Sequence, residues 1–137
     1  MIDRYERAEL LTALWKLASV ERPMPTSHGI LDRALKAKST VLPPELVGDL
    51  SFSVTSVGLR CLDLPDILLA AQEALLTSEP NPTYLETKVT IDSQQAREIV
   101  LNFGMEPSRA KEIGRILLDE VDRLKASEPE AQEPIAA

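Results

Sequence analysis

The chain has 137 residues, of which 44% are apolar and 27% charged, a length and composition typical of one globular domain with its own core. Its net charge of -7 excludes the general electrostatic attraction to nucleic acid or anionic membranes that a basic protein has. Its single cysteine excludes an internal disulfide, and no apolar run approaches the roughly 20 residues of a membrane span. The N-terminus also lacks the apolar centre of a signal peptide, so we expect a cytoplasmic protein.

The first predicted helix covers residues 3 to about 20, and its apolar face is wider than one neighbouring helix needs. The residues of this face are Leu10, Leu11, Leu14, Trp15, Leu17 and Ala18. Either the helix is central to the fold, or part of its face, at Leu11 and Trp15, meets another protein chain. Both interpretations remain open.

Arg22-Pro23-Met24-Pro25 ends this helix, because proline restricts its own backbone and that of the preceding residue. Thr26 or Ser27 is expected to cap a second helix over about residues 28–38. The only histidine, His28, has no recognisable nucleophile or acid partner, so we expect it to have a surface or capping role.

Residues 41–62 allow two interpretations. A short helix opened by Pro43-Pro44 comes first, and the remainder is rich in Ser, Thr and Val, which favours a strand. The alternation of apolar residues changes parity near Ser56 or Gly58, which predicts a bulge in that strand. The alternative is a helix, because the apolar spacing also fits a helical period. On either interpretation Cys61 is expected to be a small buried residue.

Asp63-Leu64-Pro65-Asp66 carries the signals of a helix start, namely a capping acid, an early proline and a further acid in the first turn. The expected buried side comprises Ile67, Leu68, Ala71 and Leu75. The run Ser78–Pro82 is expected to end the helix. A half-buried strand follows, because apolar and polar residues alternate over residues 85–91. With the earlier strand it forms either a parallel crossover or a non-adjacent antiparallel pair.

Thr87–Lys125 carries the strongest local signals, and we expect the other apolar segments to cover the helix pair that it forms. Asp92 and Gln95 can form a capping box, Gly104 can end the first helix, and Pro107 suits the first turn of the second. Each helix has one apolar stripe. These stripes are Ala96, Ile99, Val100 and Phe103, and Ala110, Ile113, Leu117, Val121 and Leu124.

Gly114 lies inside the second of these helices, where glycine costs roughly 1 kcal/mol relative to alanine. Close approach of another helix is one reason for a glycine at such a position. Together with the broad face of the first helix, this predicts contact with a second chain. The predicted protein interface comprises Leu11, Trp15, Gly114 and Leu118.

In residues 96–115, a helix, a turn at Gly104 and a second helix that starts at Pro107-Ser108 follow one another. This arrangement resembles the helix-turn-helix of many bacterial and phage repressors. The resemblance implies a small DNA-binding regulator. In such a regulator, the second helix presents these residues to a major groove: Ser108, Arg109, Lys111, Glu112 and Arg115.

No grouping of residues predicts catalysis. The five glycines form no phosphate-binding loop, and a metal site of histidines and cysteines needs more than one of each. The carboxylate pairs Asp63/Asp66 and Asp119/Asp122 are explained by helix capping and by a charged helix face. We therefore expect no enzymatic activity, cofactor or metal.

The sequence predicts an α+β fold that is mainly helical, with about five helices and a small two-stranded β element. One domain covers residues 1–125, and residues 126–137 form a flexible acidic tail. We expect a non-enzymatic protein–protein interaction module, either an adaptor or a homo-oligomer, in which the acidic middle of the chain influences partner choice. A helix-turn-helix regulator is the alternative, and an immunity protein, secretion chaperone or virion component is the third possibility.

Overall fold

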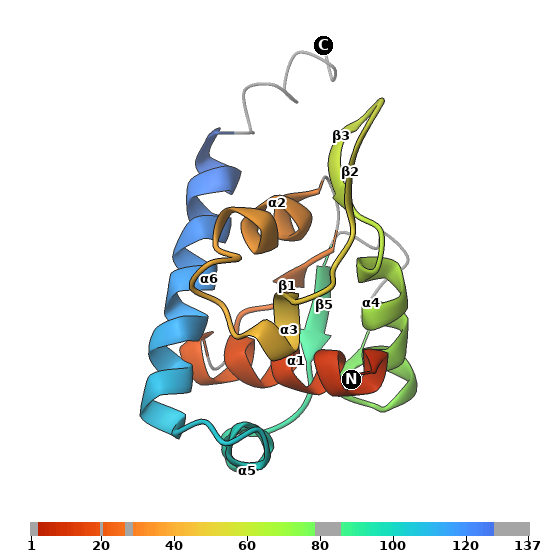
Figure 1. Ribbon diagram of the computed structural model, residues 1–137. Helices are drawn as coiled ribbons and strands as arrows, with labels where there is room; N and C mark the ends of the chain where they lie inside the picture. Colours follow the sequence, from red (N-terminus) through yellow and green to blue (C-terminus); the bar gives the residue numbers. More distant parts are fainter. Residues whose placement is uncertain (1–2, 20, 27–28, 79–85, 128–137) are drawn as a thin grey trace.

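The computed structural model describes residues 3–19, 21–26, 29–78 and 86–127 (Figure 1). These residues form a mainly helical α+β fold, as predicted. The helices are α1 (Arg4–Ser19), α2 (Ile30–Ala37), α3 (Pro44–Val47), α4 (Leu64–Glu73), α5 (Ser93–Asn102) and α6 (Pro107–Ser127). The strands are β1 (Met24–Pro25), β2 (Phe52–Thr55), β3 (Gly58–Cys61), β4 (Thr77–Ser78) and β5 (Glu86–Val89). A three-stranded sheet, in the order β1-β5-β4, accompanies the two-stranded β2-β3 element.

Helix α1 is the centre of the molecule. It packs against α6, α5 and α4, and Figure 1 shows it lying between α6 and α4 with α5 below. Leu14 and Trp15 have no exposed surface, and the Thr12 hydroxyl is buried as well, donating to the Ala8 carbonyl at 2.8 Å. A helix that is apolar on nearly all sides needs partners on nearly all sides. The central position of the first helix is confirmed, whereas the prediction that residues 87–125 organise the chain is wrong.

Helices α5 and α6 start where the sequence predicts. The Asp92 carboxylate accepts from the Gln95 N–H at 2.7 Å, and the Gln95 side chain accepts from the Asp92 N–H at 2.9 Å. Gly104 has φ 77°, the left-handed conformation that ends α5. Both helices pack mainly on α1 rather than on each other. Helix α6 continues to Ser127, slightly beyond the predicted start of the tail, and residues 128–137 lie outside the described residues.

The ambiguous middle segment forms a short helix, α3, and then a β-hairpin. Strands β2 and β3 pair antiparallel around the turn Ser56-Val57, with Thr55 opposite Gly58. The Thr55 hydroxyl accepts from the Val57 N–H at 3.2 Å and donates to the Gly58 carbonyl at 2.8 Å. The strand preference is confirmed, but the single bulged strand is wrong. The change of parity marks a turn that reverses the chain.

Strand β5 is the centre of the three-stranded sheet. Strand β1 pairs with it antiparallel, with Met24 opposite Thr87, and β4 does the same, with Thr77 opposite Val89. Thr87 and Val89 are buried and Lys88 is exposed, which confirms a half-buried strand. Neither predicted pairing with the earlier strand forms in the described part of the chain, because the short strands β1 and β4 occupy both edges of β5.

Helix α2 begins without the predicted side-chain cap. Its N-cap is Gly29, with φ 67°, rather than Thr26. Ser27 and His28 lie outside the described residues, so their predicted roles stay predictions. Glycine suits this position because its φ lies in the left-handed region, and a Cβ there would also displace the guanidinium of Arg60.

Helix α4 ends at Glu73, earlier than the predicted stop at Ser78–Pro82. The Leu76 N–H donates to the Ala71 carbonyl at 2.8 Å, which closes the last turn in the pattern of a helix that ends on a left-handed residue. That residue is Leu75, with φ 63° and a side chain that is 79% exposed. Leu75 therefore does not belong to the buried side of α4, contrary to the prediction.

Leu75→Gly should stabilise the protein by about 1 kcal/mol, because glycine takes the left-handed conformation without the steric cost of about 1–2 kcal/mol that leucine carries. The measurement is urea unfolding followed by circular dichroism. Leu69→Ala, at a half-exposed position inside α4, is the control and should change stability by less than about 0.5 kcal/mol. A clear loss of stability in Leu75→Gly would show that the exposed leucine supports the fold.

Candidate functional site

The residues predicted to form a protein interface lie inside the molecule. Trp15 has no exposed surface, and Leu11 and Leu118 are 1% and 4% exposed. Gly114 is buried where α6 crosses α1. The packing of α1 against α4, α5 and α6 uses the apolar surface that seemed surplus in the sequence. While the chain keeps this fold, these side chains are not available to a partner.

The close helix approach predicted at Gly114 is present, but both helices belong to one chain. A Cβ at Gly114 would lie 2.2 Å from the Leu14 carbonyl oxygen and 3.1 Å from the Ala18 Cβ. The crossing of α6 over α1 therefore requires glycine. The close approach of another helix at Gly114 was predicted correctly. The prediction that this helix belongs to a second chain is wrong.

The residues of the predicted recognition helix are exposed on the first turns of α6. They are Ser108, Arg109, Lys111, Glu112 and Arg115. Nη1 of Arg109 lies 3.4 Å from a Glu112 carboxylate oxygen, and Nη1 of Arg115 donates to the Ala18 carbonyl at 3.5 Å. Both arginines thus have partners within the chain, and the exposed acids Glu106 and Asp119 flank them. This surface mixes both signs of charge and does not concentrate the positive charge that attracts DNA phosphates.

An open hollow of about 380 Å³ lies beside the turn between α5 and α6. Its lining is mainly apolar, with Glu45, Glu106 and Arg109 as the charged side chains among the described residues. None of those lining residues is a histidine, a cysteine or a hydroxyl residue, so they supply no nucleophile with a neighbouring base.

Several of the titratable groups named in the sequence analysis are buried or take part in hydrogen bonds that stabilise the fold. Burial raises the pKa of the Cys61 thiol, which disfavours the reactive thiolate. Asp63 accepts the Ser51 N–H at 2.6 Å, at the base of the β2–β3 hairpin, instead of capping α4. A hydrogen bond from Arg22 lowers the pKa of the Asp122 carboxyl. These contacts hold the fold together and do not form an acid–base pair.

Alternate residues of β2 direct their backbone N–H and C=O groups away from β3. The Leu62 N–H donates to the Ser51 carbonyl at 2.7 Å, which marks these residues as a hydrogen-bonded pair at the base of the hairpin. Hydrogen-bonded and non-hydrogen-bonded pairs alternate along an antiparallel ladder. Phe52 and Val54 are therefore in non-hydrogen-bonded pairs, and their N–H and C=O groups point to the outer edge of β2.

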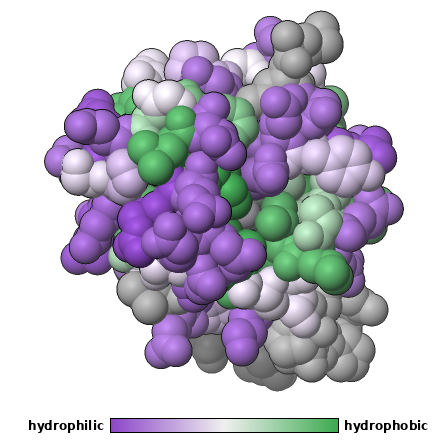
Figure 2. All heavy atoms as spheres, turned by 90° about the horizontal axis from the view of Figure 1, so that it is seen from below, coloured by the Kyte–Doolittle hydropathy of each residue, from purple (hydrophilic) through white to green (hydrophobic). Residues whose placement is uncertain are grey.

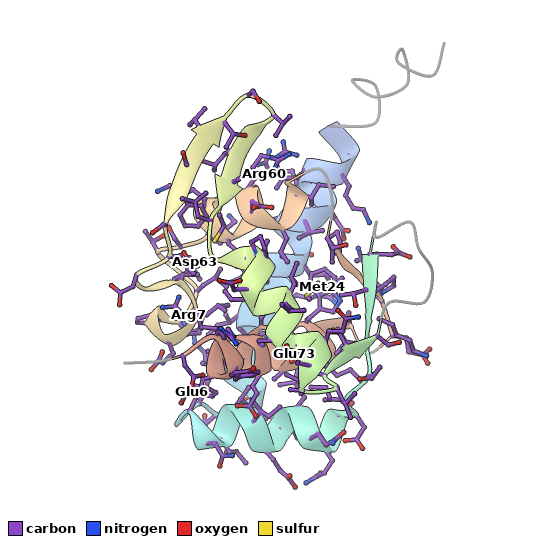
Figure 3. The ribbon with its side chains drawn as sticks, turned by 90° about the vertical axis from the view of Figure 1, so that its right-hand side faces the viewer. Glu6, Arg7, Met24, Arg60, Asp63 and Glu73 are labelled. Atoms are coloured by element: carbon purple, nitrogen blue, oxygen red, sulfur yellow. The ribbon has the colours of Figure 1, made fainter. Side chains whose placement is uncertain are left out.

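The outer edge of β3 is partly covered. A carboxylate oxygen of Asp32, on α2, accepts the Cys61 N–H at 2.7 Å. Nη1 of Arg60 donates to the Leu59 carbonyl at 2.9 Å. Figure 3 shows Arg60 extending from the hairpin on the side of α2. Two of the backbone groups that β3 turns outward, the Cys61 N–H and the Leu59 carbonyl, thus have partners within the chain.

The outer edge of β2 is open. In the described ranges, no residue forms a hydrogen bond with the backbone of Phe52 or Val54. No charged residue lies between Asp49 and Arg60, and β2 contains no lysine or proline, the residues that commonly prevent an edge strand from pairing. Figure 3 shows β2 on the side of the hairpin away from α2. This edge can accept another extended strand.

One face of the hairpin is apolar and becomes more exposed toward the turn. Phe52 and Cys61 lie opposite each other, as do Val54 and Leu59, so the four side chains share a face. Cys61 at the base is 2% exposed and Val54 near the turn is 82% exposed. Val57, in the turn itself, is 69% exposed, and Figure 1 shows the hairpin extending past the body of the molecule. The base of the hairpin packs on α2, and a further strand would cover the exposed apolar side chains nearer the turn.

Other exposed apolar side chains are dispersed over the surface. Leu69, Leu75 and Leu101 are 52%, 79% and 56% exposed. Figure 2 shows the face that carries α5, where hydrophobic atoms form separate patches between hydrophilic side chains. Isolated exposed apolar residues are normal on soluble proteins. At the hairpin, exposed apolar side chains adjoin the open edge of β2.

Two features of the sequence indicated this site and were not used to predict it. Hydroxyl residues and Gly58 surround the change of parity, as is typical of a hairpin turn. The stretch 50–59 also contains no charge. Interpreting the parity change as a bulge concealed the second strand, and with it the open edge.

No group of three or more His, Cys, Asp or Glu side chains in the described ranges is placed to hold a metal ion. Within the same ranges, no helix has the length and apolar character needed to cross a membrane. Comparison of the chain with protein-family models, curated proteins and solved structures found no match.

Proposed function

We propose that the protein is a non-enzymatic interaction module that binds an extended segment of a protein partner along the edge of β2. The observation that carries this proposal is the open edge itself, at which the backbone groups of Phe52 and Val54 have no hydrogen-bond partner in the described chain. In strand addition, backbone hydrogen bonds supply affinity and alternate side chains supply selectivity.

The apolar face of the hairpin supplies the selectivity. Phe52 and Val54 project on the same face, so an added strand places every second side chain beside them. Apolar or aromatic residues at those positions of the partner would cover Val54, whereas a charged residue there would lose hydration against apolar surface. The preferred partner segment is therefore extended, with apolar residues at alternate positions.

The test is affinity capture from a lysate of the source cell with tagged wild-type protein, Val54→Lys and Val57→Lys. Val57→Lys is the matched control, because it adds the same charge to an exposed valine in the turn, outside the paired strands. We expect wild type and Val57→Lys to capture the same protein, and Val54→Lys to retain at most about a tenth of it, since 1.4 kcal/mol corresponds to a tenfold change in affinity. Circular dichroism of each variant checks that the fold is intact.

Equal capture by Val54→Lys and wild type would contradict binding at the β2 edge. Half of each lysate is treated with nuclease, because the helix-turn-helix alternative requires DNA. Loss of the captured material on nuclease treatment, with DNA recovered from the untreated half, would support that alternative. Arg109→Ala and Arg115→Ala would then be the informative variants.

A further inference from the structure

We infer that the strand which β2 accepts is β2 of a second copy of this chain, antiparallel to the first, with the two-fold axis at Ser53. This inference rests on the proposed function, because it names the partner of the same edge. It follows from the backbone pattern, the side chains and the charge of the hairpin.

The backbone of β2 is complementary to itself. Phe52 and Val54 direct their N–H and C=O groups outward, while those of Ser53, between them, face β3. When two antiparallel copies place Ser53 opposite Ser53, each Phe52 lies opposite Val54 of the second copy. These two residues then exchange both of their backbone hydrogen bonds. Every backbone group that β2 turns outward has a partner in this register.

The side chains match in the same register. Phe52 of each copy lies beside Val54 of the other, and aromatic with β-branched residues are favourable cross-strand pairs. This contact covers Val54, which is 82% exposed in the single chain. Both hairpins become one sheet with Phe52, Val54, Leu59 and Cys61 of each copy on one face, where Nζ of Lys36 lies 5.2 Å from the centre of the Phe52 ring. The enlarged sheet adds to the support that α2 gives to the base of each hairpin.

The charge of the chain also suits contact at this edge. Each copy has a net charge of -7, so two copies repel each other overall. No charged residue lies between Asp49 and Arg60, so the paired strands place no like charges opposite each other. The hairpin extends past the body of the molecule (Figure 1).

The size of the contact determines the strength of the association. Strand β2 has four residues, and a contact of that length is small beside the roughly 1,200 Å² that specific, stable interfaces bury. We therefore expect a dimer in a concentration-dependent equilibrium with single chains.

Sedimentation equilibrium over a wide range of protein concentrations tests the dimer. For wild type we expect the mass to rise from that of one chain toward that of two. In Val54→Lys the midpoint should move to concentrations at least about tenfold higher, because each dimer then holds two lysines at the seam. Val57→Lys, the matched control in the turn, should leave the midpoint within about threefold of wild type.

Disulfide formation tests the register. In the inferred dimer Ser53 lies opposite Ser53 in a non-hydrogen-bonded pair, where opposed Cβ atoms are close enough for a disulfide. Ser53→Cys should therefore form a covalent dimer in a glutathione redox buffer. Thr55→Cys is the matched control, because Thr55 lies opposite Ser51 of the second copy and away from the axis. Cys61 is replaced by alanine in both variants, so that each chain has one thiol.

A mass of one chain at every concentration would overturn the inference. So would a dimer that Val54→Lys leaves unchanged, or one that Thr55→Cys cross-links better than Ser53→Cys. If the chain stays single but Val54→Lys still loses a captured protein, the proposed function stands with that protein as the occupant. If that capture is unaffected as well, both proposals fail.

Discussion

Gly114→Ala is expected to destabilise the protein by about 1–3 kcal/mol, the usual cost of overpacking a core. The propensity of an isolated helix predicts the opposite sign, since alanine is better than glycine by roughly 1 kcal/mol inside a helix. The added Cβ would lie 2.2 Å from the carbonyl oxygen of Leu14 and 3.0 Å from its carbonyl carbon. These are backbone atoms of α1, which cannot rotate aside, so α6 must move away and loosen the packing of Leu117 and Val121.

Gly104→Ala is the control for this experiment. Gly104 has φ 77° and no neighbouring atom within 4 Å of an added Cβ, so its substitution tests backbone conformation without a clash. We expect a loss of about 1 kcal/mol there. Urea unfolding followed by circular dichroism measures both variants. A Gly114→Ala protein more stable than wild type would contradict the close crossing of α1 and α6.

Trp15→Ala is expected to cost about 3–5 kcal/mol, a large part of the 5–15 kcal/mol that stabilises a typical domain. Trp15 has no exposed surface, and its indole N–H donates to the Arg22 carbonyl at 2.8 Å. The substitution leaves a cavity in the centre of the fold and deprives a carbonyl of its donor. We therefore expect lost helical structure, not the change of assembly state at constant helicity that an interface residue would give.

Trp15→Phe separates the two contributions, because it keeps most of the buried ring and loses the hydrogen bond. Its expected cost is smaller, about 1–2 kcal/mol. Trp15 is the only tryptophan, so circular dichroism rather than fluorescence follows unfolding in all variants. A Trp15→Ala protein as stable as wild type would place this residue on the surface and contradict the central position of α1.

The parts of the fold that depend on local signals were predictable. The capping box of Asp92 and Gln95 and the left-handed Gly104 act within a few residues of themselves, so the sequence indicates α5 and the start of α6 without knowledge of the rest. The alternation of residues 86–89 likewise indicated a half-buried strand. Such elements follow from backbone hydrogen bonding and side-chain period alone.

Features that depend on contacts between residues far apart in the sequence were not predictable from the spacing of apolar and polar residues. The broad apolar face of α1 shows that it is covered, but not whether another chain or α4, α5 and α6 cover it. Strands β1 and β4 have two residues each, too few to show a period, and they exist because β5 lies between them. Leu75 fits the helical stripe of α4, yet the helix ends before it, and the residue turns to solvent.

The candidate site was the least predictable part. Apolar stripes indicate burial, so they directed the interface prediction to Trp15, Leu11 and Leu118, which are core residues. An open strand edge is a property of the backbone, visible only when the pairing of β2 and the covering of β3 by Asp32 are known. The uncharged stretch 50–59 was the side-chain signal that accompanied it.

Amide hydrogen exchange resolved by residue, at low and high protein concentration, tests the open edge of β2 most directly. We expect the Phe52 and Val54 amides to exchange rapidly at low concentration and more slowly at high concentration, because they gain partners only when a strand is added. The Ser53 amide, which faces β3, should be protected at both concentrations. Protection of Phe52 and Val54 equal to that of Ser53 at low concentration would show that the edge is already covered within one chain, and would contradict both proposals.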